Sequence, residues 1–200
     1  MTLSAADAVE SEHDTIIQAQ AGDRWAFGEL VQRHRSGVVN VVYRMCGDPD
    51  LAEDAAQETF VRAWEHLNSF RIRNSTQVPG GADAVHRGFR NWLYRIATNC
   101  TLSELRRRKP TANVDDLPLQ DSRRGPERIA EESERAEAVR RAVLALPEAS
   151  RSALILREYE GLSYRDIADT LDIPMGTVMS RLNYARRQLR EQLATYLEVD

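Results

Sequence analysis

Hydrophobic residues recur at helical spacing along most of the chain, and no stretch shows the strict alternation typical of a half-buried strand. The spacing predicts a short helix at 14–21, after a loose polar start, and a longer helix at about 23–45. A third helix is expected to open at Asp48 or Asp50 and to run to Phe70. Further helices are predicted at about 89–109, 128–146 and 147–159. The sequence therefore predicts an all-α protein.

Two stretches interrupt the helical pattern. Residues 71–88 contain Pro79, Gly80 and Gly81 among small polar residues, which predicts a long loop. Residues 111–127 combine two prolines, a glycine and scattered acids, a composition typical of a linker. We therefore expect two small helical domains, at 14–109 and 128–200, joined by a flexible linker at 110–127.

Residues 161–190 have the pattern of a helix-turn-helix. Ser163 is a suitable N-cap for a first helix, whose inward positions are Ile167, Ala168 and Leu171. Pro174 ends that helix, so residues 172–174 are expected to form the turn, with Gly176 giving the backbone freedom there. A second helix is predicted from Thr177. Its inward positions are Val178, Leu182, Ala185 and Leu189, and its outward positions are Ser180, Asn183, Tyr184 and Arg187.

A helix presented in this way fits the major groove of DNA and reads base edges from its N-terminal half. Residues 174–190 also contain four arginines and no acid, which favours contact with phosphate. An ordinary helical hairpin with a solvated basic face would show the same spacing, so the pattern alone leaves both interpretations open.

The charge balance limits how the chain could bind nucleic acid. With 27 basic and 31 acidic residues, the net charge of −4 argues against binding through bulk charge, so DNA contacts must come from local basic faces. One such face is the run of Arg106, Arg107, Arg108 and Lys109, which exceeds what a helix C-terminus needs and suggests phosphate contact. The acids at the start of the third helix, in contrast, are explained by the helix dipole alone. They are Asp50, Glu53, Asp54 and Glu58.

Few residues carry candidate chemistry. Cys46 and Cys100 lie far apart and are expected to be reduced and partly buried, and the four histidines, at 13, 34, 66 and 86, lack ligand spacing. No catalytic motif such as a Gly-rich phosphate loop, GxSxG or HExxH is present. The sequence therefore predicts neither an enzyme nor a cofactor or metal site. Because no signal-peptide pattern or apolar run of transmembrane length is found, we expect a cytoplasmic protein without membrane insertion.

Three segments, in this order, resemble the extracytoplasmic-function (ECF) class of bacterial sigma factors. Region 2.2 of that class is similar to AEDAAQETFVRAW from Ala52, and regions 2.3 and 2.4 are similar to FRNWLYRIATNCTLSELRRR from Phe89. Region 4 is similar to the segment from Leu146, LPEASRSALILREYEGLSYRDIADTLDIPMGTVMSRLNYARRQL. The resemblance covers about residues 14–195. It implies a subunit that directs RNA polymerase to specific promoters by binding the core enzyme, melting the −10 element and reading the −35 element.

The resemblance also implies roles for particular residues. Three positions match those that dock on the coiled-coil of the polymerase β′ clamp: Asp54, Gln57 and Glu58. Asn99 matches a position that lines the pocket for a flipped −10 base, and Arg106, Arg107 and Arg108 would contact the same strand. The −35 element would be read by Thr177, Ser180, Asn183, Tyr184 and Arg187. In the linker, the acids that would suit a channel built for nucleic acid are Asp115, Asp116 and Asp121.

Two features depart from the family pattern. Met179 stands where members usually carry Arg or Lys, so a usual −35 contact is absent and the base preference is expected to differ. The 71–88 stretch is longer than the short connection usual in the family. It is either a tolerated surface insertion or a source of extra promoter or anti-sigma contacts. An anti-sigma factor is an expected partner.

Two other classes of protein would also use a helix-turn-helix or a helical pair. A conventional helix-turn-helix regulator, with an N-terminal sensory or dimerisation module, would bind duplex DNA without polymerase. A purely structural interaction protein would show no salt-dependent affinity for DNA at all.

Overall fold

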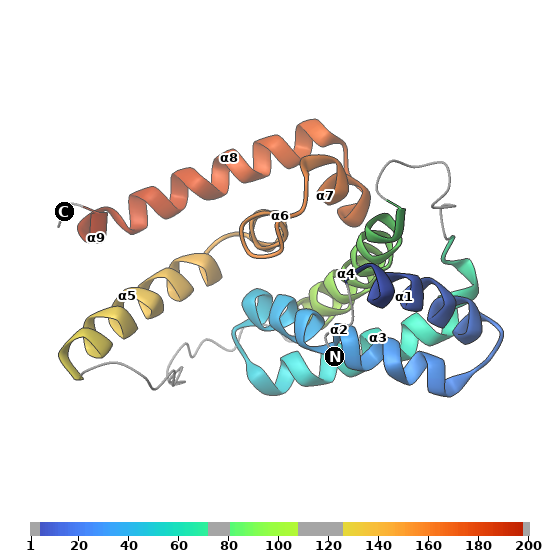
Figure 1. The fold of residues 1–200 in the computed structure, drawn as a ribbon. Helices are drawn as coiled ribbons and strands as arrows, with labels where there is room; N and C mark the ends of the chain where they lie inside the picture. The colour runs from blue at the N-terminus through green and yellow to red at the C-terminus, as the bar shows by residue number, and fades with distance from the viewer. Residues whose placement is uncertain (1–4, 72–80, 108–125, 198–200) are drawn as a thin grey trace.

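The computed structural model describes residues 5–71, 81–107 and 126–197, and all regular secondary structure in these ranges is helical (Figure 1). The N-terminal half consists of α1 (Ala5–Gln20), α2 (Arg24–Cys46), α3 (Pro49–His66), a single turn η1 (Leu67–Ser69) and α4 (Gly81–Arg107). The C-terminal half consists of α5 (Pro126–Leu144), α6 (Glu148–Glu158), α7 (Tyr164–Leu171), α8 (Met175–Gln192) and α9 (Ala194–Leu197). The all-α prediction is confirmed. None of the helices in these ranges is long and apolar enough to cross a membrane.

Local capping sets the boundaries of α2 and α3. The Asp23 carboxylate accepts hydrogen bonds from the first backbone N–H groups of α2, and Asp48 does the same for α3. Between them, Gly47 closes α2 in the left-handed conformation, with φ of 74°. These two helices lie where the hydrophobic pattern predicts them, except that α3 ends at His66 and the chain then tightens into η1 instead of continuing to Phe70.

The core of the N-terminal half forms where α1, α3 and α4 pack around α2. The inward side of α3 is rich in alanine, which brings the neighbouring helices close; these positions are Ala52, Ala55, Ala56 and Ala63. At the other end of the core, Trp92 contacts the rings of Phe70 and Phe89 at centroid distances of 5.3 and 5.6 Å. Trp92 is therefore a packing residue, as its position in an aromatic stripe predicts.

Two helices begin earlier than the sequence pattern predicts. The expected loose start is wrong, because α1 begins at Ala5 rather than Asp14. The expected loop is wrong in its last part, because α4 begins at Gly81 rather than Phe89, and the remainder, 72–80, lies outside the described residues. Both extra segments gain burial from tertiary contacts: Glu12 of α1 and Val85 of α4 are buried. Such contacts offset the roughly 1 kcal/mol that Gly88 costs inside a helix.

The C-terminal half contains the predicted helix-turn-helix. Ser163 caps α7 in a capping box with Asp166, and α6 and α7 both pack on α8. The turn works differently from the prediction: Asp172 adopts the left-handed conformation, with φ of 56°, and α8 begins at Met175 with Gly176 already inside it. Asparagine and aspartate are among the few non-glycine residues that adopt this conformation readily, so Asp172 takes over the role expected of Gly176.

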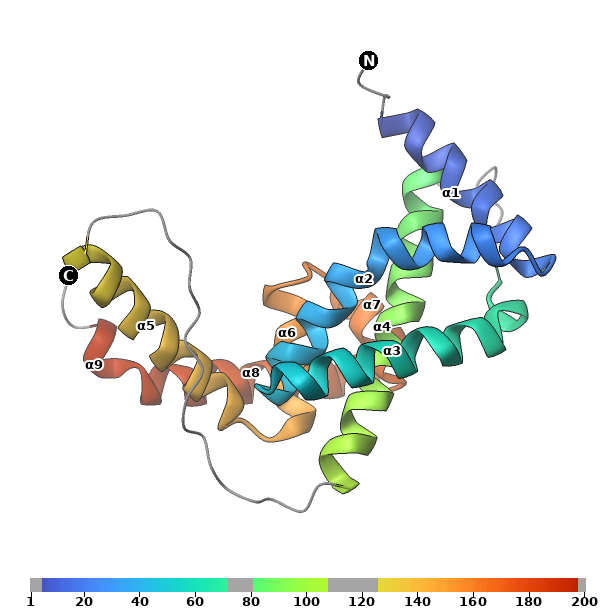
Figure 2. The ribbon, with the colours of Figure 1, turned by 90° about the horizontal axis from the view of Figure 1, so that it is seen from below.

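The two halves pack against each other, which the sequence does not reveal. Helices α5 and α6 contact α2, and α7 contacts α4 (Figure 2). The half-buried Arg151 of α6 donates hydrogen bonds to the carbonyl oxygens of Met45, Leu144 and Leu146, at 2.5, 2.6 and 2.9 Å. Tyr94 of α4 donates to the Glu160 carboxylate at 2.5 Å. In this arrangement, the ends of α2 and α5 and the middle of α4 are joined to the helix-turn-helix.

Candidate nucleic-acid interface

The outward face of α8 is free to meet a ligand along most of its length. The inward positions Val178, Leu182 and Ala185 are fully buried, so the opposite side of the helix must face solvent. Four of the residues predicted to contact the −35 element lie on that exposed side: Ser180, Asn183, Tyr184 and Arg187. Thr177 is half-buried at the start of the same helix. The sequence-predicted −35 residues therefore share one face, beginning at the helix N-terminus.

Side-chain contacts distinguish the polar residues of α8 from one another. The Ser180 hydroxyl donates to the Thr177 carbonyl at 2.9 Å, which leaves it as a hydrogen-bond acceptor toward DNA. The Arg187 guanidinium lies over the Tyr184 ring, 5.6 Å from its centroid. Arg186 differs, because it forms a salt bridge with Glu158 at 2.8 Å. Arg186 thus holds α8 on α6. In the sequence it is indistinguishable from the other three arginines at 174–190, which favour contact with phosphate.

A second polar face runs along the C-terminal part of α4. Asn99 is exposed, while its neighbours Thr98 and Cys100 are buried. Arg106 and Arg107 are also exposed at the end of the helix, and Arg107 pairs with Glu104 at 2.5 Å. Their companion Arg108 lies outside the described residues. One turn before Asn99, Arg95 forms a salt bridge with Asp172 at 3.1 Å, so this face begins next to the turn of the helix-turn-helix.

The acidic positions of α3 form a third exposed face. Asp54, Gln57 and Glu58 are all exposed, and Glu58 pairs with Arg62 one turn later at 2.7 Å. Val61 continues the same helical stripe and keeps 53% of its surface exposed. Val61 is not among the residues that the sequence pattern singles out. A single exposed apolar residue is common on protein surfaces, so Val61 by itself does not identify an interface.

The sequence also missed a cluster of possible metal ligands. Glu12, His34 and His86 lie far apart in the chain, but the structure brings their ligand atoms within 4.8 Å of one another. The two cysteines do not join them: Cys100 is buried and Cys46 half-buried, and neither forms a disulfide within the part of the chain that the structure describes.

Comparisons with known proteins match both halves of the chain. The Sigma-70 region 2 family matches residues 30–77, and the Sigma-70 region 4 family matches residues 136–189. The ECF RNA polymerase sigma factor SigW of Bacillus subtilis is 33% identical over 189 residues, covering 89% of this chain and 94% of the relative.

Two solved structures share the fold. CnrH, in complex with the cytosolic domain of CnrY, superposes with a TM-score of 0.64 at 24% identity, over 92% of this chain and 98% of that one. The sigma factor RpoE of Bartonella quintana, in complex with the anti-sigma factor NepR, gives a TM-score of 0.63 at 23% identity, over 87% and 98%. At these identities, the two structures establish the arrangement of helices only.

The fold and its exposed faces thus define a two-part, all-helical protein with a helix-turn-helix. The chain belongs to the ECF family of RNA polymerase sigma factors. This assignment confirms the resemblance seen in the three sequence segments and disfavours a conventional helix-turn-helix regulator. The family is not a class of enzymes.

Proposed function

We propose that this sigma factor binds core RNA polymerase through the exposed stripe of α3, contacts the −10 element with α4 and reads the −35 element with α8. We assign these roles to two domains, at 14–109 and 128–200, joined by a linker at 110–127. Helices α1 and α5 begin before these bounds, so each domain is extended at its start to include the whole helix. The protein acts in the cytoplasm as a subunit of polymerase and has no catalytic activity of its own.

The observation that carries this proposal is the segregation of three polar faces on three different helices. Asp54, Gln57 and Glu58 form an exposed acidic stripe on α3, whereas exposed arginines lie at the end of α4 and on α8. A chain with a net charge of −4 has to contact DNA through local basic faces, and these lie on other helices than the acidic stripe proposed to meet the polymerase. The exposed Val61 adds apolar area to the α3 stripe.

On α4, we assign Asn99 to the pocket for a flipped −10 base and Arg106 and Arg107 to the backbone of the same strand. Flipping a base costs a few kcal/mol of unstacking, which hydrogen bonds to a polar side chain and contacts with basic groups offset. Arg108 continues the same basic run in the sequence.

On α8, we assign base reading to Thr177, Ser180, Asn183 and Tyr184, and phosphate contact to Arg187. Met179 is 43% exposed on this helix, so it meets the DNA as an apolar side chain where relatives present a cation. An exposed methionine favours contact with a thymine methyl group over a guanine edge.

We also propose that an anti-sigma factor holds this chain inactive. RpoE, which shares the fold, is described in complex with an anti-sigma factor. The contacts between α4 and α7 present the two halves of our chain together, as a single surface that one partner can cover.

Transcription with purified components tests the core-binding assignment. Added to sigma-free core polymerase, the protein is expected to start transcripts at promoters of its own genome. The double variant Asp54→Lys, Glu58→Lys is expected to lose at least about tenfold in core affinity, because charge reversal turns attraction into repulsion. Glu29→Lys, at an exposed acid on α2, is the matched control.

Two results would contradict the proposal. One is the absence of any transcript with the unmodified protein. The other is unchanged core binding by the double variant in a direct binding assay, which would move the polymerase interface away from α3.

A further inference from the structure

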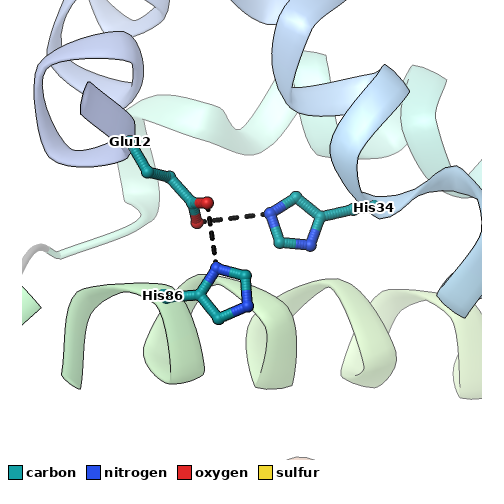
Figure 3. Close-up of side chains that lie close together, drawn as sticks. All are labelled: Glu12, His34 and His86. Carbon is teal, nitrogen blue, oxygen red and sulfur yellow. Dashed lines mark hydrogen bonds and ion pairs between the residues drawn. The ribbon is translucent and has the colours of Figure 1, made fainter. Parts of the chain in front are cut away.

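Three helices of the N-terminal half bring a carboxylate and two imidazoles together in one buried cluster (Figure 3). Glu12 comes from α1, His34 from the middle of α2 and His86 from the first turns of α4. One Glu12 oxygen lies 3.2 Å from Nε2 of His34, and the other lies 2.9 Å from Nδ1 of His86. The side chains of Glu12 and His34 are 4% and 5% exposed. Burying a carboxylate is costly unless it is strongly paired, so this cluster is a specific feature of the fold.

The residue types and their spacing match a site for zinc. Two histidines and one glutamate form a ligand set that zinc proteins use with a water molecule at the fourth position. Two ligands that each lie 2.0–2.1 Å from a tetrahedral zinc are separated by about 3.3 Å. The two carboxylate–imidazole distances, 3.2 and 2.9 Å, are close to that value. The two imidazoles pair with different Glu12 oxygens, and the ligand atoms lie within 4.8 Å of one another, so a cation held by all three side chains would draw them closer together.

The surroundings also suit a cation site. Both Glu12 oxygens point to imidazole nitrogens, so the carboxylate already faces the two other ligands. The His34 ring is held by edge contact with Phe89 at 5.3 Å and by stacking on His86 at 5.2 Å. The His86 side chain is 42% exposed, which opens one side of the cluster to water. The site thus has two buried ligands and one half-exposed ligand.

We propose that Glu12, His34 and His86 bind a divalent d-block cation, with Zn²⁺ as the best match. The bound cation would tie α1 both to α2 and to the start of α4, which lie 22 and 74 positions further along the chain. Because α4 is one continuous helix, the same restraint would fix the helix that carries Asn99.

Thermal unfolding of the full chain, after treatment with a chelator, tests this site. Saturating Zn²⁺, at about 100 times its dissociation constant, is expected to raise the unfolding midpoint by roughly 5–10 °C. Mg²⁺ is expected to give no shift, because it prefers oxygen ligands. Co²⁺ gives a second, direct measurement, since its visible absorption reports on the geometry of its ligands.

The variant His86→Gln separates a cation site from a hydrogen-bonded cluster. Its amide still donates to Glu12, so the fold is kept, but the imidazole ligand is lost and Zn²⁺ affinity is expected to fall at least about tenfold. His66→Gln, at an exposed histidine of α3, is the matched control and is expected to keep the full shift. The proposal is overturned if Zn²⁺ leaves the midpoint of the unmodified protein unchanged, or if His86→Gln shows the same shift and Co²⁺ spectrum. Neither measurement depends on polymerase or DNA.

Discussion

Replacing Arg151 tests how much one side chain of α6 contributes to stability by binding the ends of α2 and α5. Its guanidinium donates to carbonyl oxygens at the C-terminal ends of α2 and α5, where backbone oxygens lack partners within their own helix. Arg151→Met keeps the aliphatic stem and removes all three hydrogen bonds. The direct consequence is that three carbonyl groups lose a donor, and the one on Met45 belongs to the N-terminal half.

The expected magnitude follows from two opposing effects. An unpaired buried carbonyl costs about 1–3 kcal/mol, and three are affected. Burial lowers the pKa of the Arg151 guanidinium, which shows that its charge is partly desolvated, and removing that charge returns part of the cost. We therefore expect Arg151→Met to lower the free energy of unfolding by about 2–4 kcal/mol. The free energy of unfolding of Arg151→Lys is expected to lie between those of Arg151→Met and the unmodified protein. The lysine ammonium is a point-like charge and cannot donate to all three oxygens as the guanidinium fork does.

Urea denaturation followed by circular dichroism measures this change. Arg165→Met, at an exposed arginine of α7, is the control and is expected to stay within about 0.5 kcal/mol of the unmodified protein. If Arg151→Met also stays within that margin, the three hydrogen bonds contribute no net stability and the reasoning is wrong.

Three further predictions concern other contacts. Burial and the hydrogen bond to a carboxylate raise the pKa of Tyr94, so the phenol ionises at lower pH in the unfolded chain than in the folded one. The free energy of unfolding is therefore expected to fall as pH rises above about 10, and Tyr94→Phe is expected to remove this contribution in urea titrations. Gly47→Ala is expected to cost about 1–2 kcal/mol from its left-handed backbone, while Gly28→Ala, within α2 and facing open space, is expected to gain about 0.5–1 kcal/mol in the same assay. In binding assays with −35 variants, Asn183→Ala is expected to change base preference, whereas Arg187→Ala weakens all sequences alike and lowers the salt slope by about 1; equal losses for both variants across all sequences would contradict this assignment.

The sequence predicts those parts of the fold that depend on local signals. Asp23, Asp48 and Ser163 each begin a helix by accepting backbone hydrogen bonds from the next few residues, and this information lies within one turn of the chain. Hydrophobic spacing likewise identifies the buried side of α8, and hence its exposed face. For this reason the helices α2, α3, α7 and α8 are expected close to where they lie.

Other parts depend on partners far away in the chain. The first turns of α1 and α4 look too polar or too rich in glycine for a helix, but Glu12 and His86 meet there across 74 positions. Arg151 reads as an ordinary charge on an amphipathic helix, and only the packed structure shows that it serves two other helices. For the candidate interfaces, the sequence correctly expects the α3 and α8 residues to be exposed, while their binding roles stay predictions.

The packing of the two halves limits the reach of the chain along DNA. The −10 and −35 elements lie about 25 base pairs apart, or about 85 Å at 3.4 Å per pair. The 18 residues from 108 to 125 connect α4 to α5 and span at most about 65 Å when fully extended. Under the proposed function, the linker and the helices together have to cover this distance, while the contacts of α7 with α4 and of α6 with α2 hold the two halves together. Any separation of the halves along a promoter therefore has to offset the free energy of these contacts.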